Sequence, residues 1–303
     1  MPAPATTPDL APIRAFLDDR HGAIAEEAGR FAAERIATLP EPADDAAARV
    51  QAHEVLRLAG GAGLFRHAIP AAWGGAAETP DLRACCLVRE ALAAASPLAD
   101  AVFALQALGG MPITLGGSDA LRERWLPEIA AGRAMAAFAM TEPEAGSDVS
   151  SLATTARREP GVNPAGSDVY VLDGRKSFIS NAGIADVYAV FAATDPAAGN
   201  RGISCFLVPA DALGLRFLGP QVLSAPHPLG EIAFEGCRIL AENRLGEEGE
   251  GFKLGMRTLD RLRPTVAAAA CGMASRALAE ALAYARRRRQ FGKTLAEHQI
   301  IQE

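Results

Sequence analysis

The sequence predicts an α+β protein in which a helical region, a β-rich region and a second helical region follow one another. Residues from about 9 to 131 are rich in Ala, Leu, Arg and Glu at helical spacing. From about 134 to 240, short segments rich in Val, Ile, Phe and Tyr are bounded by turn residues, as strands are. Helical spacing resumes after "GEEGEG". We therefore expect domains at residues 1–133, 134–243 and 244–303.

Composition excludes several classes of protein. A chain of 303 residues with 50% hydrophobic residues can bury a substantial core. A net charge of −6 opposes nucleic-acid binding over the whole surface. The cysteines are odd in number and show no C-x-x-C spacing, so neither a disulfide scaffold nor a metal site is expected. They are Cys85, Cys86, Cys205, Cys237 and Cys271.

Localisation is expected to be cytoplasmic, with no membrane partner. No uninterrupted apolar stretch reaches the roughly 18 residues of a membrane span. The start of the chain, "MPAPATTPDLAPIRAFLDD", lacks the basic-then-apolar order of a signal peptide.

The first two regions have clear local signals. Segments such as "DALRERWLPEIAAG" predict several helices, separated by breaks such as "IPAAWGG". The β-rich region is expected to form a small antiparallel sheet. Within it, Asp173-Gly174 in "VLDGRKSF" is the dipeptide that a tight hairpin turn prefers. Residues 160–168, "PGVNPAGSD", are expected to form a loop.

In the third region, a helix is expected from about residue 251, with Pro264 kinking it or marking its effective start. The arginine run at 286–289 suits a helix C-terminus, where cations complement the helix dipole. A further helix is expected to open at Thr294, because Glu297 three residues later completes a capping box.

The junction between helical and β-rich sequence, "AMTEPEAGSDVSSLATTARRE", is a candidate ligand site. Gly146 has no Cβ, and turn residues expose unpaired N–H groups, so backbone and the Ser147 hydroxyl can approach a large cofactor closely. The alternative is an ordinary turn with Glu142, Glu144 and Asp148 as its solvated rim.

Four motifs in collinear order give this chain a resemblance to the acyl-CoA dehydrogenase family. They are "AFAMTEPEAGSD", "YVLDGRKSFISNAG", "GEEGEGFKLGMRTLDRLRP" and "RRRRQFGKTLAEHQ". The resemblance implies an N-terminal helical domain, a central antiparallel β domain and a C-terminal helical bundle, with FAD as cofactor. It further implies oxidation of an acyl-CoA to the trans-2-enoyl-CoA, with hydride transfer to the flavin and electrons passed to an electron-transferring flavoprotein.

The resemblance also assigns cofactor contacts to residues of this chain. Phe138, Met140 and Thr141 match the stretch that lines the flavin. Gly146 and Ser147 follow, and Ser147 also matches a contact to the thioester ligand. In "KSFISN", Phe178 stands where the family often has Trp and stacks on the flavin, whereas Ser180 stands where it often has Thr. The full set in this part of the chain is Phe138, Met140, Thr141, Gly146, Ser147, Phe178, Ile179 and Ser180.

A second group of cofactor contacts is implied from a neighbouring subunit. Residues near the C-terminus match the family's segment that reaches the FAD of a neighbour, and a guanidinium suits its pyrophosphate. These residues are Arg288, Gln290, Phe291, His298 and Gln299. A homo-oligomer, dimer or tetramer, with FAD at the subunit interface is therefore expected.

Substrate contacts are implied in "LDRLRP". Asp260 and Arg263 match positions near the pantetheine and the reacting carbon, although on a helix they can equally pair with each other. Most family members carry the catalytic glutamate far downstream, beyond Glu303 here; others carry it at the position of Leu262. No catalytic base is thus expected within these residues, and a product ending at Glu303 is expected to be inactive and unstable, with an incomplete helical bundle.

One stretch departs from the family pattern. "VLSAPHPLGEIAFEGCRI" lacks the family's M-G-x-R-x-S pattern and places His227 between two prolines, where we expect a loop residue rather than a catalytic one. The acyl group cannot be read from the sequence, and an acyl carrier protein thioester is an alternative to CoA. A flavin oxidase or monooxygenase, and a catalytically silent acyl-thioester-binding relative, are the alternative functions.

Overall fold

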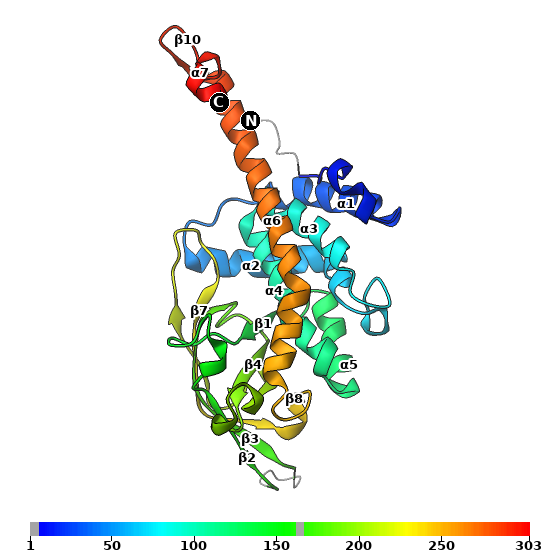
Figure 1. Cartoon of the computed structure of the whole chain (residues 1–303), viewed down its shortest axis with the longest axis vertical. Coiled ribbons are helices and arrows are strands. Elements are labelled where there is room, and N and C mark those ends of the chain that lie inside the picture. The colour runs from blue at the N-terminus through cyan, green and yellow to red at the C-terminus, as the bar shows by residue number, and fades with distance from the viewer. Residues whose placement is uncertain (1–5, 162–166) are drawn as a thin grey trace.

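The structure, a computed structural model, describes residues 6–161 and 167–303 and contains three parts (Figure 1). Helices form the first part, a sheet the second, and one long helix links the sheet to a small C-terminal unit. The helices are α1 (Arg20–Phe31), α2 (Asp45–Gly61), α3 (Leu82–Ala95), α4 (Pro97–Gly116), α5 (Asp119–Ala130), α6 (Gly251–Arg287) and α7 (Gln299–Gln302).

Polar N-caps set where four of these helices begin. The side chains of Asp44, Asp81, Ser96 and Ser118 each accept a hydrogen bond from a backbone N–H in the first turn of the helix that follows. Ser96 also ends α3, so α3 and α4 meet at a single residue and turn back on each other.

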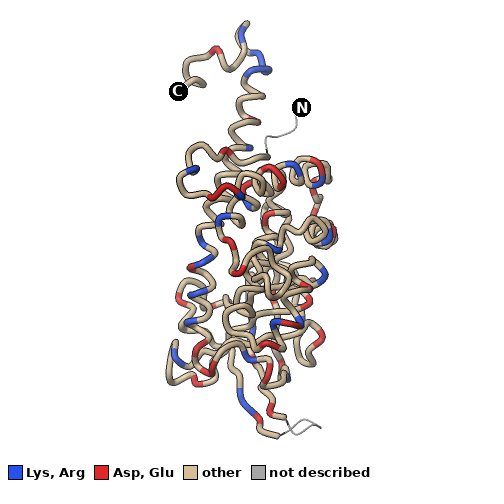
Figure 2. Tube along the Cα trace, turned by 90° about the vertical axis from the view of Figure 1, so that its right-hand side faces the viewer, with Lys and Arg blue, Asp and Glu red and all other residues tan. Residues whose placement is uncertain are grey.

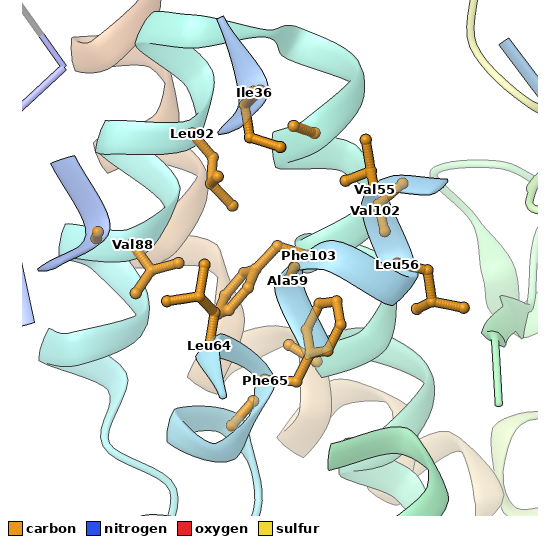
Figure 3. Close-up of a cluster of buried hydrophobic side chains, with 14 of the residues drawn as sticks. Ile36, Val55, Leu56, Ala59, Leu64, Phe65, Val88, Leu92, Val102 and Phe103 are labelled. Atoms are coloured by element: carbon orange, nitrogen blue, oxygen red, sulfur yellow. The ribbon is translucent and has the colours of Figure 1, made fainter. Parts of the chain in front are cut away.

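A hydrophobic cluster holds the helical part together (Figure 3). The rings of Phe65 and Phe103 stack at its centre, with centroids 5.8 Å apart. Val88 and Leu92 approach them from α3, and Val55 and Leu56 from α2. Burial of such side chains contributes roughly 1.5–3 kcal/mol each, so this cluster fixes α2, α3 and α4 relative to one another.

The strands form one twisted sheet that lies beside the helices (Figure 1). Its order is β6-β7-β3-β2-β4-β5-β8, with β1 paired to β4. The predicted antiparallel sheet is confirmed for most pairs, but β1 and β4, and β2 and β4, are parallel. The strands are β1 (Ala136–Ala139), β2 (Thr155–Glu159), β3 (Val169–Ser180), β4 (Val187–Ala193), β5 (Ile203–Pro209), β6 (Leu215–Pro220), β7 (Leu229–Leu240) and β8 (Arg244–Leu245).

The predicted hairpin at Asp173-Gly174 is wrong. Both residues lie inside the continuous strand β3, which pairs with β7 on either side of them. The register shifts between Leu172 and Gly174, so the dipeptide marks a bulge rather than a turn. Gly174 is required there because its φ is 147° and a Cβ would come within 2.5 Å of the Thr154 hydroxyl oxygen. The loop expected at 160–168 lies largely outside the described residues.

Helix α6 runs unbroken through Pro264, so Pro264 does not mark its start. Its buried residues recur at helical spacing from Gly251 to Gly272, and this stripe packs against α3 and α4. Arg276 still donates to the Ala94 carbonyl oxygen at the end of α3. The last turns of the helix project away from the body and lead to the hairpin of β9 (Arg289–Gln290) and β10 (Lys293–Thr294) (Figures 1 and 2). The capping box at Thr294 and Glu297 is confirmed, although it opens a short 3-10 turn before α7.

Within the described ranges, α4 and α6 are long and apolar enough to span a membrane by length and composition. The apolar window of α4 is 72% buried, as in a core helix, whereas that of α6 is 11% buried. Core helices pass the same test, so this finding assigns neither helix to a membrane. The expected absence of a membrane partner stays a prediction.

A buried polar network lies where α3, α4 and α6 meet. The Arg89 guanidinium donates two hydrogen bonds of 2.7 Å to Asp100 and one of 2.8 Å to the Thr265 hydroxyl. All three side chains are buried, and each is hydrogen-bonded within the network. The network therefore ties the long helix to the helical part at one fixed position.

A second buried ion pair joins β3 to the loop that follows β1. The Lys176 ammonium lies 2.8 Å from Glu142 Oε1 and donates to the Met140 carbonyl oxygen. Burial lowers the pKa of Lys176 to about 8 against the opposing effect of Glu142. Burial alone would raise the pKa of Glu142, but Lys176 and hydrogen bonds from Thr154 and Ala153 hold it below its usual value.

The close approach of α6 to α3 predicts a cost for any side chain at Gly272. A Cβ there would lie 2.1 Å from the Glu90 carbonyl oxygen, so we expect Gly272→Ala to lower the free energy of unfolding by about 1–3 kcal/mol. Urea unfolding measures it. The control is Gly22→Ala in α1, where no atom lies within 4 Å of the added Cβ. That change should be neutral or stabilising by up to about 1 kcal/mol, and an equal loss in both variants would contradict the packing argument.

Breaking the Lys176–Glu142 pair should be strongly destabilising. We expect Glu142→Gln to lower the free energy of unfolding by about 3–5 kcal/mol, because the Lys176 ammonium then stays buried without a counter-charge. Glu128→Gln is the matched control, since Glu128 and its partner Arg133 lie on the surface, with 42% and 61% of their side chains exposed. It should change the unfolding transition little. An equal loss of unfolding free energy in both variants would show that the buried pair contributes no more to stability than the surface pair.

Candidate functional site

Three segments of the β domain meet at the predicted helix–sheet junction. They are the loop after β1 (residues 140–147), the end of β3 (176–181) and the loop between β6 and β7 (221–228). The Ser177 backbone N–H donates to the Thr141 carbonyl oxygen at 3.0 Å, beside the Lys176–Glu142 pair. These contacts bring together residues that are about 35 positions apart along the chain.

The expected solvated rim of this junction is only partly present. Glu144 and Asp148 are exposed, but Glu142 is 6% exposed and accepts N–H groups from Ala153 and Thr154 at 2.6 and 3.0 Å. Glu142 therefore shapes the loop from inside, and the interpretation of this residue as rim is wrong.

Gly146 and Ser147 lie on the exposed tip of the loop. Within the part of the chain that the structure describes, neither residue makes a hydrogen bond through its main chain or side chain. No atom lies within 4 Å of the position that a Cβ on Gly146 would take. Unpaired N–H groups and a hydroxyl in open space are suited to an anionic or strongly polar ligand.

The three residues before this loop differ in exposure. The half-buried Phe138 ring lies 4.8 Å from Phe191, centroid to centroid. Met140 is buried, and its side chain contacts Gly255 at the start of α6, where no Cβ would fit. Thr141 is half-buried, and its hydroxyl has no hydrogen-bond partner among the described residues.

At the end of β3, side chains alternate between the surface and the core. Phe178 is 57% exposed and its φ is 56°, a left-handed conformation that is uncommon for a bulky residue. Ile179 is 1% exposed and packs in the core of the sheet. Ser180 is half-buried, and its hydroxyl lies 2.9 Å from His227 Nε2. The exposed aromatic ring beside a hydroxyl is a surface on which a flat heterocycle can stack.

Two residues of this site were missed in the sequence. Gln221 accepts the Phe178 N–H at 2.5 Å and donates to the Ser177 hydroxyl at 2.8 Å, while His227 contacts Ser180. His227 lies in a loop, as expected, but it belongs to the site. The one sequence signal at His227 is its position between two prolines in a stretch that departs from the family pattern. No sequence signal marks Gln221.

The C-terminal group of predicted contacts lies at the far end of α6 (Figure 1). Within the described residues, the Arg288 guanidinium makes no ion pair or hydrogen bond. Phe291 is 94% exposed and forms the β9–β10 turn with Gly292, both at positive φ. His298 packs edge-on against Phe291, and Gln290 and Gln299 are exposed. The fold of a single chain therefore keeps this group apart from Phe178 and Ser147.

The predicted substrate positions lie on the middle of α6. Asp260 and Arg263 are exposed and form an ion pair with each other, as the alternative interpretation expects. Leu262 is 6% exposed and packs in the helical core. A leucine has no group that accepts a proton.

A cavity of about 350 Å³ separates the helical part from the 221–228 loop. Its lining includes Leu39, Gln51 and Leu98 on one side and Ser224, Ala225 and Pro226 on the other. The 221–228 loop therefore lines this cavity and also carries His227, which contacts Ser180.

Comparison with known proteins gives three family matches that follow the chain in order. The N-terminal, middle and C-terminal domain models of acyl-CoA dehydrogenase match residues 18–133, 137–237 and 249–303. A probable acyl-CoA dehydrogenase of Mycobacterium tuberculosis is 39% identical over 237 residues, which cover 77% of this chain and 58% of that protein. The chain therefore spans less than two thirds of this relative.

Solved structures agree with this match. Butyryl-CoA dehydrogenase from Megasphaera elsdenii superposes with a TM-score of 0.83 at 33% identity, over 94% of this chain and 74% of that one. A structure described as an electron-transferring flavoprotein of Acidaminococcus fermentans gives 0.84 at 34% identity, over 94% and 73%. An acyl-CoA dehydrogenase of Bacillus anthracis complexed with FAD gives 0.82 at 29%, over 94% and 48%. The chain belongs to the acyl-CoA dehydrogenase family.

Proposed function

We propose that this chain is part of an FAD-dependent acyl-CoA dehydrogenase, which oxidises an acyl-CoA to the trans-2-enoyl-CoA. The observation that carries the proposal is the exposed Phe178 ring, held in a left-handed backbone conformation beside the Ser180 hydroxyl. Residues in such strained conformations cluster at ligand sites. Thr141, whose hydroxyl has no hydrogen-bond partner among the described residues, is joined to this strand end through its carbonyl oxygen, and the exposed tip at Ser147 follows in the same loop.

These residues fit FAD by their chemistry. Phe178 offers a flat face for the flavin ring, and Thr141 and Ser180 offer hydroxyls to its polar edge. Gly146 and Ser147 offer unpaired N–H groups to a phosphate. FAD supplies the hydride acceptor, and hydrogen-bond donors in a preformed site stabilise the negative charge that reduction places on the ring.

A second subunit completes the proposed site. The Arg288 guanidinium has no partner among the described residues and suits a pyrophosphate, but Arg288 caps the C-terminal end of α6, far from β3 (Figure 1). We therefore propose a homo-oligomer, dimer or tetramer, in which the projecting end of α6 reaches the FAD of a neighbour. We also propose a cytoplasmic location and an electron-transferring flavoprotein as acceptor, a partner that fits the similarity to the Acidaminococcus structure.

The proton acceptor of the reaction is not the residue at position 262. Leu262 is buried in the helical core, and neighbouring Asp260 is paired with Arg263. We propose that these two charged residues contact the thioester ligand and that the base lies elsewhere in the assembled enzyme.

The proposal is tested by flavin retention and reduction. We expect the assembled enzyme, purified from its natural source, to retain FAD. An acyl-CoA added without oxygen should bleach the flavin absorbance, and electron-transferring flavoprotein should restore that absorbance faster than oxygen does. Faster recovery with oxygen would indicate an oxidase. Retained flavin that no acyl-CoA bleaches would contradict the dehydrogenase proposal and favour a silent binding protein.

Two variants test the residues. Phe178→Ala should weaken FAD binding by about three- to tenfold, because an aromatic stack contributes roughly 0.5–1.5 kcal/mol. Phe16→Ala is its control, since Phe16 is 74% exposed on a remote helical turn and should leave FAD affinity unchanged.

Arg288→Ala should weaken FAD binding only in the oligomer, whereas Arg286→Ala should not. Fluorescence titration measures all four, and an equal effect of Phe178 and Phe16 would contradict the placement.

A further inference from the structure

The 221–228 loop is attached at both ends to the segment that carries Phe178 and Ser180. At its start, Gln221 bonds to the Ser177 hydroxyl and the Phe178 N–H. At its end, His227 contacts Ser180, and the Pro228 carbonyl oxygen accepts the Asn181 N–H at 2.6 Å. The residues between, from Val222 to Ala225, are exposed. The loop therefore acts as a strap across the end of β3.

The strap holds a strained stretch of backbone. Phe178 and Asn181 have φ values of 56° and 63°, and each lies next to one of the attachments. Such conformations cost roughly 1–3 kcal/mol each and persist only where the surroundings fix them. Ser180 lies between them, so its position is fixed by the same contacts.

Helix α2 closes the other side of His227. Arg49 donates to the carbonyl oxygens of Ala182 and Leu229 at 2.5 and 2.9 Å, and it pairs with Asp45 at 2.6 Å. Its guanidinium also lies over the Phe217 ring. Asp45 and Arg49 are the charged groups that act on His227, with opposite effects on its pKa.

The Ser180 hydroxyl has one proton, and the direction of its hydrogen bond with His227 determines whether that proton is available to a ligand. If His227 Nε2 accepts, Ser180 donates to His227 and offers only lone pairs to a ligand beside Phe178. If Nε2 carries a proton, it donates to Ser180, and the hydroxyl proton is free for the ligand. The 2.9 Å distance fits both directions.

We propose that His227 is a positioning residue that accepts from the Ser180 hydroxyl in its neutral, Nδ1-protonated form and donates to it when both ring nitrogens carry protons, and so makes the reduction potential of bound FAD depend on pH. This inference rests on the proposed function. Reduction places negative charge on the flavin, so a hydroxyl that donates to it favours the reduced form. Protonated His227 therefore raises the potential.

The direction of the pKa shift places the transition. Burial is the largest effect and lowers the pKa of His227 below its ordinary 6.5; Asp45 opposes this and Arg49 adds to it. In the cofactor-free protein His227 is thus neutral at pH 7, and the transition is expected on the acid side of 6.5.

The test is the reduction potential of the FAD-loaded chain, measured by spectroelectrochemical titration between about pH 5 and 8. The reduction potential of the flavin itself changes with pH, and this slope is the same in all variants. Wild type should show an additional inflection below pH 6.5, which His227→Gln should lose, because an amide keeps a hydrogen bond to Ser180 but does not titrate. Ser180→Ala should lose the inflection too, since His227 acts through that hydroxyl.

His67→Gln is the matched control. His67 is also half-buried with a pKa lowered mainly by burial, but it lies in the helical part beside Asp81 and Glu27. It should keep the wild-type profile. An inflection that survives in His227→Gln, or in Ser180→Ala, would overturn the inference and leave the proposed function intact. A chain that retains no flavin would overturn the proposed function and this inference with it.

Discussion

The candidate site depends on the buried ion pair between Lys176 and Glu142. Glu142 shapes the loop after β1 by accepting two backbone N–H groups, and Lys176 anchors that loop to β3. One main-chain hydrogen bond, from Ser177 to Thr141, and the Asn181 side-chain hydrogen bond to the Ala136 carbonyl oxygen add to this attachment. A charge buried this deeply needs its partner, so the loop and the strand end keep one relative position. The site is therefore preorganised from within the fold.

Local sequence signals predicted local structure well and long-range contacts poorly. The capping box at Thr294 depends only on residues three apart, and it is present as expected. The prediction of a turn at Asp173-Gly174 was wrong because β7 pairs with β3 on both sides of the dipeptide. A rule based on neighbouring residues takes no account of such a distant strand. Glu142 was assigned to a solvated rim for the same reason, since its partner lies 34 residues away.

Residue patterning pointed to the junction at Gly146 and Ser147, whereas Phe178 and Ser180 came only from motif resemblance. The fold places Phe178, Ser180, Thr141 and Ser147 around one junction, but the motif residues do not describe what holds them there. Gln221 and His227 hold part of the site in place, and of these two only His227 lies in the stretch that departs from the family pattern. Within one chain, Arg288 and its neighbours lie far from the other predicted cofactor contacts. Their expected partner is a second subunit, which the structure of a single chain does not contain.

The two ends of the strap are attached to the site by different kinds of side chain. Both ends of the 221–228 loop bind the end of β3, through an amide side chain at Gln221 and an imidazole at His227. An amide is neutral at every accessible pH, whereas protonation of His227, on the acid side of pH 6.5, changes its Nε2 from acceptor to donor in the proposed arrangement. The strap therefore has one constant attachment and one that responds to protons. Because the responsive attachment contacts the hydroxyl that is proposed to face the flavin, a change in the protonation of this loop would act on the cofactor through one hydrogen bond.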